Sequence, residues 1–256
     1  MDKYCVIGDP IDHSLSPKIH NCLFKHYGLN ACYTKFRVST DNLKEKVDCL
    51  IKEGYKGFNV TYPLKAAIKE HIDQISYHGK NIASVNTVAL SNGKLLGDNT
   101  DFRGMQLVLD PFRSEEIYIL GSGNMAHTTI YALKEFTNRN ITVVCRNKKA
   151  GENLKKQYPW INLMSIEFFK KENISGGVTV NTLPLNLDIS HLFENKIAQV
   201  LLDCNYNQTV SLSNDLQYIS GLELLYAQAI KSFEIWTGYQ PTLETLKELL
   251  KKYQQS

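Results

Sequence analysis

The stretch with the clearest chemical potential runs from Gly57 to Lys65, Gly-Phe-Asn-Val-Thr-Tyr-Pro-Leu-Lys. Its apolar residues predict a short buried strand that Pro63 ends, so Lys65 is expected to emerge from a rigid turn. A lysine held in this way can stabilise negative charge that grows on an oxygen and can supply a proton to it. The simpler interpretation is that Lys65 opens the next helix and points into water, as most lysines do.

Two serines precede a predicted helix that runs from Pro17 to about Tyr27. Ser16 stands directly before the proline and is expected to cap the helix N-terminus. Capping does not explain Ser14, which lies two residues earlier. Because free backbone N–H groups and the helix dipole favour an anion, the two hydroxyls could instead hold a carboxylate there.

Small polar residues also follow a predicted β-hairpin made of residues 85–90 and 94–97. Asn86 lies in its first strand, and Asp101 closes the run Asp98-Asn99-Thr100-Asp101 before a helix that is expected to begin near Phe102. We expect hairpin and loop to bring Asn86 and Asp101 towards the strand ends. Asp101 as a helix N-cap and Asn86 as a turn residue are the structural alternatives.

A glycine-rich loop follows the apolar strand 117–120 and reads Gly121-Ser122-Gly123-Asn124-Met125-Ala126. A helix to about residue 136 and a strand over 141–145 are expected next, which is the setting of a dinucleotide-binding fingerprint. Gly121 would permit the tight turn, and Gly123 would let a pyrophosphate approach the backbone. Ala126 would allow close packing of the helix.

The residues after the 141–145 strand favour NADP over NAD. They read Cys145-Arg146-Asn147-Lys148-Lys149 and contain no carboxylate that could bind a ribose 2′-hydroxyl. The cations could simply be solvated at the start of a helix, but positive charge is unfavourable there unless an anion lies near.

The elements that must position these residues fall into two groups. Strands near residues 4–7, 31–38 and 57–61 alternate with helices, and the segment from Lys65 to Lys80 is helical by pattern. This order predicts an open, mostly parallel α/β sheet. A second α/β pattern restarts near Pro111, with later strands at 177–181 and 200–204. Helices over about 223–237 and 242–253 end the chain, and the first carries Gln228, either a satisfied core polar group or a ligand for a polyol.

Composition excludes several classes of protein. The 256 residues are 43% hydrophobic and 21% charged with a net charge of +3, which is typical of a globular protein rather than a disordered or fibrous one. Charges of both signs are interspersed, so no nucleic-acid partner is expected. The six cysteines show no zinc spacing, so no metal site is expected and a reducing, cytoplasmic location is favoured. No segment approaches eighteen apolar residues, so no membrane partner is expected.

Seven ordered motifs together resemble the shikimate 5-dehydrogenase family, within the shikimate/quinate dehydrogenase superfamily. They are Ser14-Leu15-Ser16-Pro17, Asn59-Val60-Thr61-x-Pro63-x-Lys65, Val85-Asn86-Thr87, Asn99-Thr100-Asp101, the glycine loop 121–126, Asp203-x-x-Tyr206-Asn207, and Gly221-Leu222 with Ala227-Gln228-Ala229. The resemblance implies two domains: a substrate-binding domain of residues 1–103 and 224–256, and a Rossmann-like NADP-binding domain of residues 104–223.

The resemblance also implies an activity, the reversible NADPH-dependent reduction of 3-dehydroshikimate to shikimate on the route to chorismate and the aromatic amino acids. Lys65 and Asp101 would be catalytic. The small-molecule substrate would be bound by Ser14, Ser16, Thr61, Asn86, Tyr206 and Gln228. NADP(H) would be bound by Gly121, Ser122, Gly123, Asn124, Met125, Ala126, Arg146, Asn147, Lys148, Thr182, Cys204 and Gly221. A monomer or a homodimer is expected.

Several residues depart from the family pattern, mainly in the cofactor half. Ala150 stands where a second arginine is usual, and the usual Asn-Arg-Thr is Cys145-Arg146-Asn147 here. Glycines or a proline of the pattern are replaced at Ala83, Phe102, Asn124, Asn186, Gln208 and Glu223. Two alternatives therefore stay open: a quinate/shikimate dehydrogenase with relaxed use of NAD and NADP, and a non-catalytic protein that binds the metabolite or nucleotide.

Overall fold

The computed structural model describes residues 1–135, 140–184, 187–194, 196–197, 199–206 and 216–252. The chain divides into two compact units, one of Met1–Gly104 with Tyr226–Ser256 and the other of Met105–Leu225. The predicted domain boundaries fall after residues 103 and 223. The departures Asn186 and Gln208 and the motif residue Asn207 lie outside the described residues.

The first unit is built on a six-stranded sheet in the order β2-β1-β3-β5-β6-β4. Its strands are β1 (Asp2–Gly8), β2 (Ala31–Arg37), β3 (Tyr55–Val60), β4 (Gln74–Ile75), β5 (Thr87–Ser91) and β6 (Lys94–Asp98). β1 runs parallel to β2 and β3, whereas β5 is antiparallel to β3 and β6. The predicted hairpin is thus present, and its turn places Asn92 and Gly93 at positive φ, as a tight hairpin turn requires.

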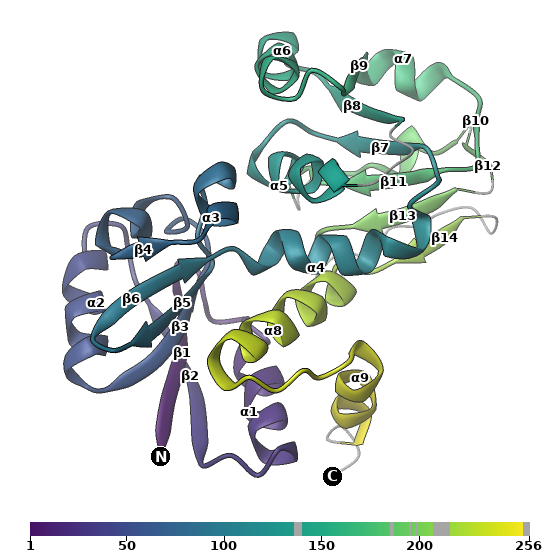
Figure 1. Ribbon diagram of the computed structural model, residues 1–256. Helices are drawn as coiled ribbons and strands as arrows, with labels where there is room; N and C mark the ends of the chain where they lie inside the picture. Colours follow the sequence, from purple (N-terminus) through teal and green to yellow (C-terminus); the bar gives the residue numbers. More distant parts are fainter. Residues whose placement is uncertain (136–139, 185–186, 195, 198, 207–215, 253–256) are drawn as a thin grey trace. The chain divides into compact units, whose positions relative to one another are not determined.

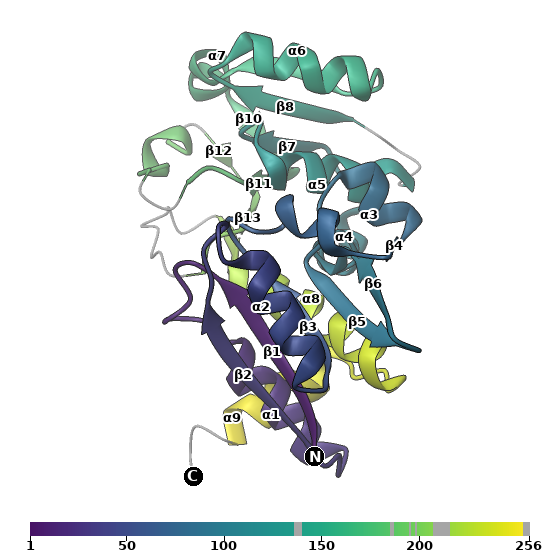
Figure 2. The ribbon, with the colours of Figure 1, turned by 90° about the vertical axis from the view of Figure 1, so that its left-hand side faces the viewer.

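Alternation along β1 explains why both faces of this sheet are covered. Cys5 and Ile7 belong to the apolar core that also includes Val47 and Leu50 of helix α2 (Leu43–Lys52). Tyr4 points to the opposite face, where its ring lies 5.1 Å from that of Phe24 in helix α1 (Ser16–His26). Figure 1 shows α1 and α2 on opposite sides of these strands, and Figure 2 looks onto the face that α2 covers.

The prediction of a helix from Lys65 to Lys80 is wrong. The segment contains a 3-10 helix at Ala67–His71, the short strand β4 and helix α3 (Tyr77–Ile82). Pairing with β6 interrupts the helical pattern, since the Asp73 carboxylate accepts a hydrogen bond from the Leu95 N–H at 2.7 Å. Ser76 then caps α3 by accepting from the Gly79 N–H. A non-local contact here overrides the local propensity.

The second unit contains a fully parallel sheet in the order β14-β13-β11-β7-β8-β9. Its strands are β7 (Ile117–Leu120), β8 (Ile141–Cys145), β9 (Asn162–Ser165), β11 (Val178–Asn181), β13 (Val200–Asp203) and β14 (Gln217–Ile219). The chain winds outwards from β7 to β9 and then in the other direction from β11. This is the strand order of a Rossmann fold, whose ligands bind where the direction reverses, beside β7. The predicted α/β class is confirmed.

The remaining elements join or cover the two sheets. They are α4 (Thr100–Leu109), α5 (Asn124–Ala132), α6 (Lys148–Gln157), α7 (Ile166–Lys171), α8 (Gly221–Thr237), α9 (Leu243–Lys252), a two-stranded pair of β10 (Ile174–Ser175) and β12 (Lys196–Ile197), and 3-10 turns at Asp110–Phe112, Leu133–Glu135 and Ser190–Leu192. None of the helices in the described ranges is long and apolar enough to cross a membrane.

Candidate active site

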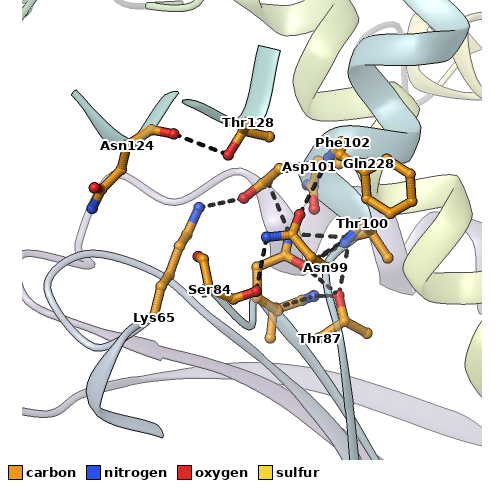
Figure 3. Close-up of polar contacts among 12 residues, drawn as sticks. Lys65, Ser84, Thr87, Asn99, Thr100, Asp101, Phe102, Asn124, Thr128 and Gln228 are labelled. Carbon is orange, nitrogen blue, oxygen red and sulfur yellow. Dashed lines mark hydrogen bonds and ion pairs between the residues drawn. The ribbon is translucent and has the colours of Figure 1, made fainter. Parts of the chain in front are cut away.

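Lys65 lies in the turn that follows β3, and the turn is fixed from both sides. The Leu64 side chain is fully buried, and the Lys65 carbonyl accepts a hydrogen bond from the Val85 N–H at 3.0 Å. The ammonium Nζ lies 2.7 Å from Oδ2 of Asp101, and only 28% of the Lys65 side chain is exposed. Lys65 is therefore aimed at a carboxylate (Figure 3), and the interpretation that it points into water is wrong.

Asn86 holds the other oxygen of the same carboxylate. Its Nδ2 donates to Asp101 Oδ1 at 2.9 Å, while its Oδ1 accepts from the Thr100 N–H at 2.7 Å. A backbone N–H can only donate and an ionised carboxylate can only accept, so the two partners fix the orientation of the Asn86 amide. Lys65, Asn86 and Asp101 therefore form one hydrogen-bonded chain.

Asp101 is not the helix N-cap. Helix α4 begins at Thr100, and the Asn99 side chain accepts from the Phe102 N–H in the manner of a cap. Asp101 thus sits in the first turn, where the helix dipole favours its negative charge. The Asn99 amide also donates to the Ser84 carbonyl at 2.9 Å, which ties the start of α4 to the segment before Asn86. Capping is done by Asn99, so the Asp101 carboxylate is left for Lys65.

Asp98 supports this corner from behind. Its carboxylate accepts from the Ser76 hydroxyl, from the Asn99 N–H at 2.8 Å and from the Arg103 guanidinium at 3.0 Å. The contacts join α3, the end of β6 and the first turn of α4. The sequence pattern singled out Asp98 only as part of a polar run, because its partners come from three different elements.

Ser14 and Ser16 lie at the start of α1, but Ser16 is not the helix cap. The helix begins at Ser16, the preceding Leu15 makes no side-chain cap, and the Ser14 hydroxyl accepts from the Ser16 N–H at 3.4 Å. The prediction that Ser16 caps the helix is wrong. The Ser16 side chain is buried and hydrogen-bonds the Tyr33 hydroxyl, whose pKa burial raises well above its ordinary value.

Thr61 and Gln228, the other predicted substrate residues of this unit, are placed by two close glycine contacts. Thr61 packs over Gly8, where an added Cβ would lie 2.3 Å from the threonine methyl. A Cβ added to Gly104 of α4 would lie 2.8 Å from the backbone nitrogen of Gln228 in α8. Both approaches need glycine. The remaining predicted substrate residue, Tyr206, is half-buried in the second unit, and burial raises the pKa of its hydroxyl.

The glycine loop of the second unit has the backbone that a pyrophosphate needs. Gly121 follows β7 with φ +110°, and a Cβ there would lie 2.7 Å from Thr182 Oγ1. Gly123 precedes α5, and a Cβ there would meet no atom within 4 Å. Open space at Gly123 and the free N–H groups of the first turn, residues 124–126, fit a bound phosphate. Ala126 is fully buried, as close helix packing requires.

The cations after β8 are exposed and scarcely paired. Arg146 lies in the turn, and Lys148, the first residue of α6, reaches Glu152 only at 4.0 Å. The Asn147 side chain is occupied as the helix cap, since it accepts from the Ala150 N–H at 3.0 Å. Arg146 and Lys148 are thus available to a 2′-phosphate, whereas the amide of Asn147 already has a structural task.

Two more predicted cofactor residues lie beyond the carboxyl ends of other strands. Cys204 follows β13, and Gly221 opens α8 so close to β13 that a Cβ would lie 2.8 Å from the Asp203 carbonyl. The Asp203 carboxylate is buried and accepts from Asn181 and from the Asn205 N–H, each at 3.0 Å. Burial raises the pKa of Asp203. These contacts fix the loops at this sheet edge. In the described part of the chain, no group of histidine, cysteine and acidic side chains could hold a metal ion.

Trp236 has a clear place that sequence reasoning missed. Its Nε1 donates to the Val88 carbonyl at 3.0 Å, and its ring covers Gly57, where a Cβ would lie 2.4 Å from Nε1. The tryptophan therefore fixes α8 against β3 and β5, the strands that lead to Lys65 and Asn86. Only the glycine within an apolar strand could have signalled such an approach.

The comparisons with known proteins agree on one family. The model of the shikimate dehydrogenase substrate binding domain matches residues 6–88. A shikimate dehydrogenase (NADP(+)) of Methanococcus maripaludis strain C7 is 34% identical over 270 residues, covering 96% of this chain and 94% of the relative.

Solved structures extend the match to the whole fold. The shikimate dehydrogenase of Aquifex aeolicus is 29% identical with a TM-score of 0.86, covering 98% of this chain and 97% of its own. Another shikimate dehydrogenase, solved in complex with NADP+, is 28% identical with a TM-score of 0.87, covering 99% and 96%. At this identity and coverage, the chain belongs to the shikimate dehydrogenase family.

Proposed function

We propose that this chain is an NADP-dependent shikimate dehydrogenase, which reversibly reduces 3-dehydroshikimate to shikimate. The observation that carries the proposal is the hydrogen-bonded row of Lys65, Asp101 and Asn86. In it the half-buried Lys65 ammonium lies 2.7 Å from the Asp101 carboxylate, and the Asn86 amide orients that carboxylate from the other side. Such a group is poised to act on an oxygen that gains or loses a proton. The identities of the substrate and the cofactor are inferred from membership of the family.

Lys65 is the proton donor of the reduction. Bound NADPH supplies the hydride. As the carbonyl carbon is reduced, negative charge grows on its oxygen, and the Lys65 ammonium stabilises that charge and gives its proton to the oxygen. In the reverse direction a neutral Lys65 takes the hydroxyl proton. Asp101 holds the ammonium in place, and Asn86 keeps the carboxylate turned towards it.

The remaining predicted residues bind the substrate. Ser14 and Ser16 hold its carboxylate beside the N-terminus of α1, where free backbone N–H groups favour an anion. Thr61, Asn86 and Gln228 hydrogen-bond the ring hydroxyls, and Tyr206 of the second unit is a further ligand of the substrate. The first unit is the substrate-binding domain and the second is the NADP-binding domain.

NADP fits the residues of the second unit. The glycine loop offers open space at Gly123 and the first N–H groups of α5 for the pyrophosphate. Arg146 and Lys148 carry the positive charge for a 2′-phosphate, and the first turn of α6 contains no acidic residue. Cys204, Thr182 and Gly221 line the neighbouring strand ends. The reaction takes place in the cytoplasm, consistent with six free cysteines.

The test is spectrophotometric. Purified protein should reduce NADP in the presence of shikimate, and kcat/KM should be higher for shikimate than for quinate and higher with NADP than with NAD. Comparable kcat/KM values for quinate or for NAD would instead identify the relaxed quinate/shikimate enzyme. Absence of turnover, with shikimate binding intact by calorimetry, would refute the enzymatic proposal in favour of a metabolite-binding protein.

A further inference from the structure

Three buried hydroxyl groups meet next to the predicted site. They belong to Thr87 at the start of β5, Thr100 at the start of α4 and Ser232 in α8, and all three residues are fully buried. The oxygen–oxygen distances are 3.0 Å between the two threonines, 2.9 Å from Thr87 to Ser232 and 3.0 Å from Thr100 to Ser232. We call this arrangement the hydroxyl triangle. Ser232 lies 145 residues from Thr87 along the chain.

A buried amide closes the triangle from the sheet side. Asn59 of β3 directs its Nδ2 at the oxygens of Thr87 and Ser232, each at 3.0 Å. The Asn59 Oδ1 in turn accepts from the Tyr33 hydroxyl at 2.7 Å. Every polar group of this network is paired with another protein group, so the network fixes one relative placement of β3, β5, α4 and α8.

The triangle touches the predicted site through Asn86. The Thr100 hydroxyl accepts from Asn86 Nδ2 at 3.0 Å, and the Thr87 hydroxyl donates to Asn86 Oδ1 at 3.1 Å. The same amide holds the Asp101 carboxylate. Any shift of the two threonine hydroxyls therefore changes the environment of both ends of the Asn86 side chain.

On its other side the triangle holds the backbone of Gln228. The Ser232 hydroxyl donates to the Gln228 carbonyl one helical turn earlier, at 3.1 Å. A hydroxyl has one proton, so the Ser232 oxygen is left to accept from its neighbours in the network. Gln228 also lies against Gly104 of α4. Ser232 is thus the group through which the helix that carries Gln228 is hydrogen-bonded to the partners of Asn86.

We propose that Ser232 is a positioning residue for substrate binding, which holds Gln228 and Asn86 in register across α8, α4 and β5. The inference rests on the proposed function, because both side chains are assigned there to the ring hydroxyls. Without the Ser232 hydroxyl, the Asn59 amide and the Thr100 hydroxyl must find other partners, and the two substrate-binding side chains lose their fixed relative position. Small misplacements of binding groups are costly to an enzyme.

The experiment compares Ser232→Ala and Ser232→Cys with the matched control Thr237→Val. Cysteine is close to serine in size but bonds weakly, so it keeps the side-chain volume if alanine prevents folding. Thr237 lies in the same helix and makes the same kind of bond, from its hydroxyl to the Phe233 carbonyl at 2.8 Å, but it is not part of the triangle. Kinetics are measured well below each melting temperature.

Both Ser232 variants are expected to raise KM for shikimate about tenfold, less than the roughly 10²-fold effect of a full 1 Å misplacement. KM for NADP and kcat should change by less than about threefold. Thr237→Val should leave all three constants unchanged. The inference is overturned if the wild-type enzyme is active and the Ser232 variants have the same KM for shikimate as the wild type. It is also overturned if the variants raise KM for NADP as much as KM for shikimate. A wild-type protein without turnover overturns the proposed function and this inference with it.

Discussion

The two predicted ligand regions differ in how many hydrogen bonds their side chains make within the protein. In the first unit, Lys65, Asp101 and Asn86 are bonded to one another and to the hydroxyl triangle behind them. In the second unit, the glycine loop offers open space, and the cations beside it are exposed. The side chains of the first region are held by hydrogen bonds within the protein, whereas the second region provides backbone N–H groups and positive charge for an anion.

This difference predicts where sequence changes are tolerated. Each side chain of the first region has several partners, so a replacement there leaves other buried groups unpaired. The second region depends on backbone conformation and on the sum of exposed charges, and one cation can stand in for another. The departures from the family pattern at Asn124, Asn147 and Ala150 fall in the second region, whereas Ala83 and Phe102 lie in the first unit.

The largest expected effect breaks the first region at its reacting end. Lys65→Met should lower kcat by about 10²-fold or more, because the transition state loses its proton donor, while KM for shikimate stays nearly unchanged. Steady-state kinetics in both directions measure this change. Lys56→Met, an exposed lysine in β3, is the control. Near-normal turnover of the Lys65 variant would remove this lysine from the chemistry.

His20 departs from the rule that polar groups buried in the first unit are paired. It is fully buried among aromatic rings, stacks on Tyr33 at 4.5 Å, and neither ring nitrogen has a hydrogen-bond partner among the described residues. Burial lowers the pKa of His20 from 6.5 to about 3. The unfolded chain therefore binds a proton as the pH falls through 6.5, whereas the folded chain does so only near 3.

The stability that neutral His20 provides is thus complete above pH 6.5 and is lost as the pH falls towards 3. Between pH 7 and pH 5 the loss should be about 2 kcal/mol of unfolding free energy. Urea unfolding of His20→Phe should lack this part of the pH dependence, whereas His26→Ala, an exposed site on the same helix, should retain it. An identical pH dependence in wild type and His20→Phe would show that His20 does not titrate in this way.

A smaller effect tests the second region. Arg146→Ala should raise KM for NADP about tenfold, the value of roughly one charge-assisted hydrogen bond to a phosphate. KM for NAD should not change, because NAD lacks the 2′-phosphate. The control is Lys156→Ala, an exposed cation near the other end of α6. Equal changes for NADP and NAD would mean that Arg146 does not contact the 2′-phosphate.

The sequence predicts best what local pattern decides. Strand, glycine loop and helix follow one another around Gly121 as expected. Lys65 follows β3 in the chain, Asp101 follows β6, and the Asp101 carboxylate contacts both Lys65 and Asn86 near the strand ends. The prediction fails where a distant segment intervenes. Residues 65–80 do not form one continuous helix, because the Asp73 carboxylate accepts a hydrogen bond from the Leu95 N–H. Ser232 lies 132 residues from its partner Thr100, and no periodicity connects them.

The smallest expected effect concerns Ala83, which stands where the family pattern has glycine and lies just before the Ser84–Asn99 contact. Its φ of 58° and ψ of 29° are left-handed, a conformation that costs an alanine about 1–2 kcal/mol. Ala83→Gly should therefore raise the unfolding free energy by about 0.5–1 kcal/mol after the greater chain entropy of glycine is subtracted. Urea unfolding measures the gain.

The control is Asn92→Gly, at φ 51°, which should gain less stability because asparagine tolerates this region. A gain in stability with unchanged KM for shikimate would show that the first region does not depend on this strain. A rise in KM would show that the alanine helps to hold Asn99 and Asn86 in place.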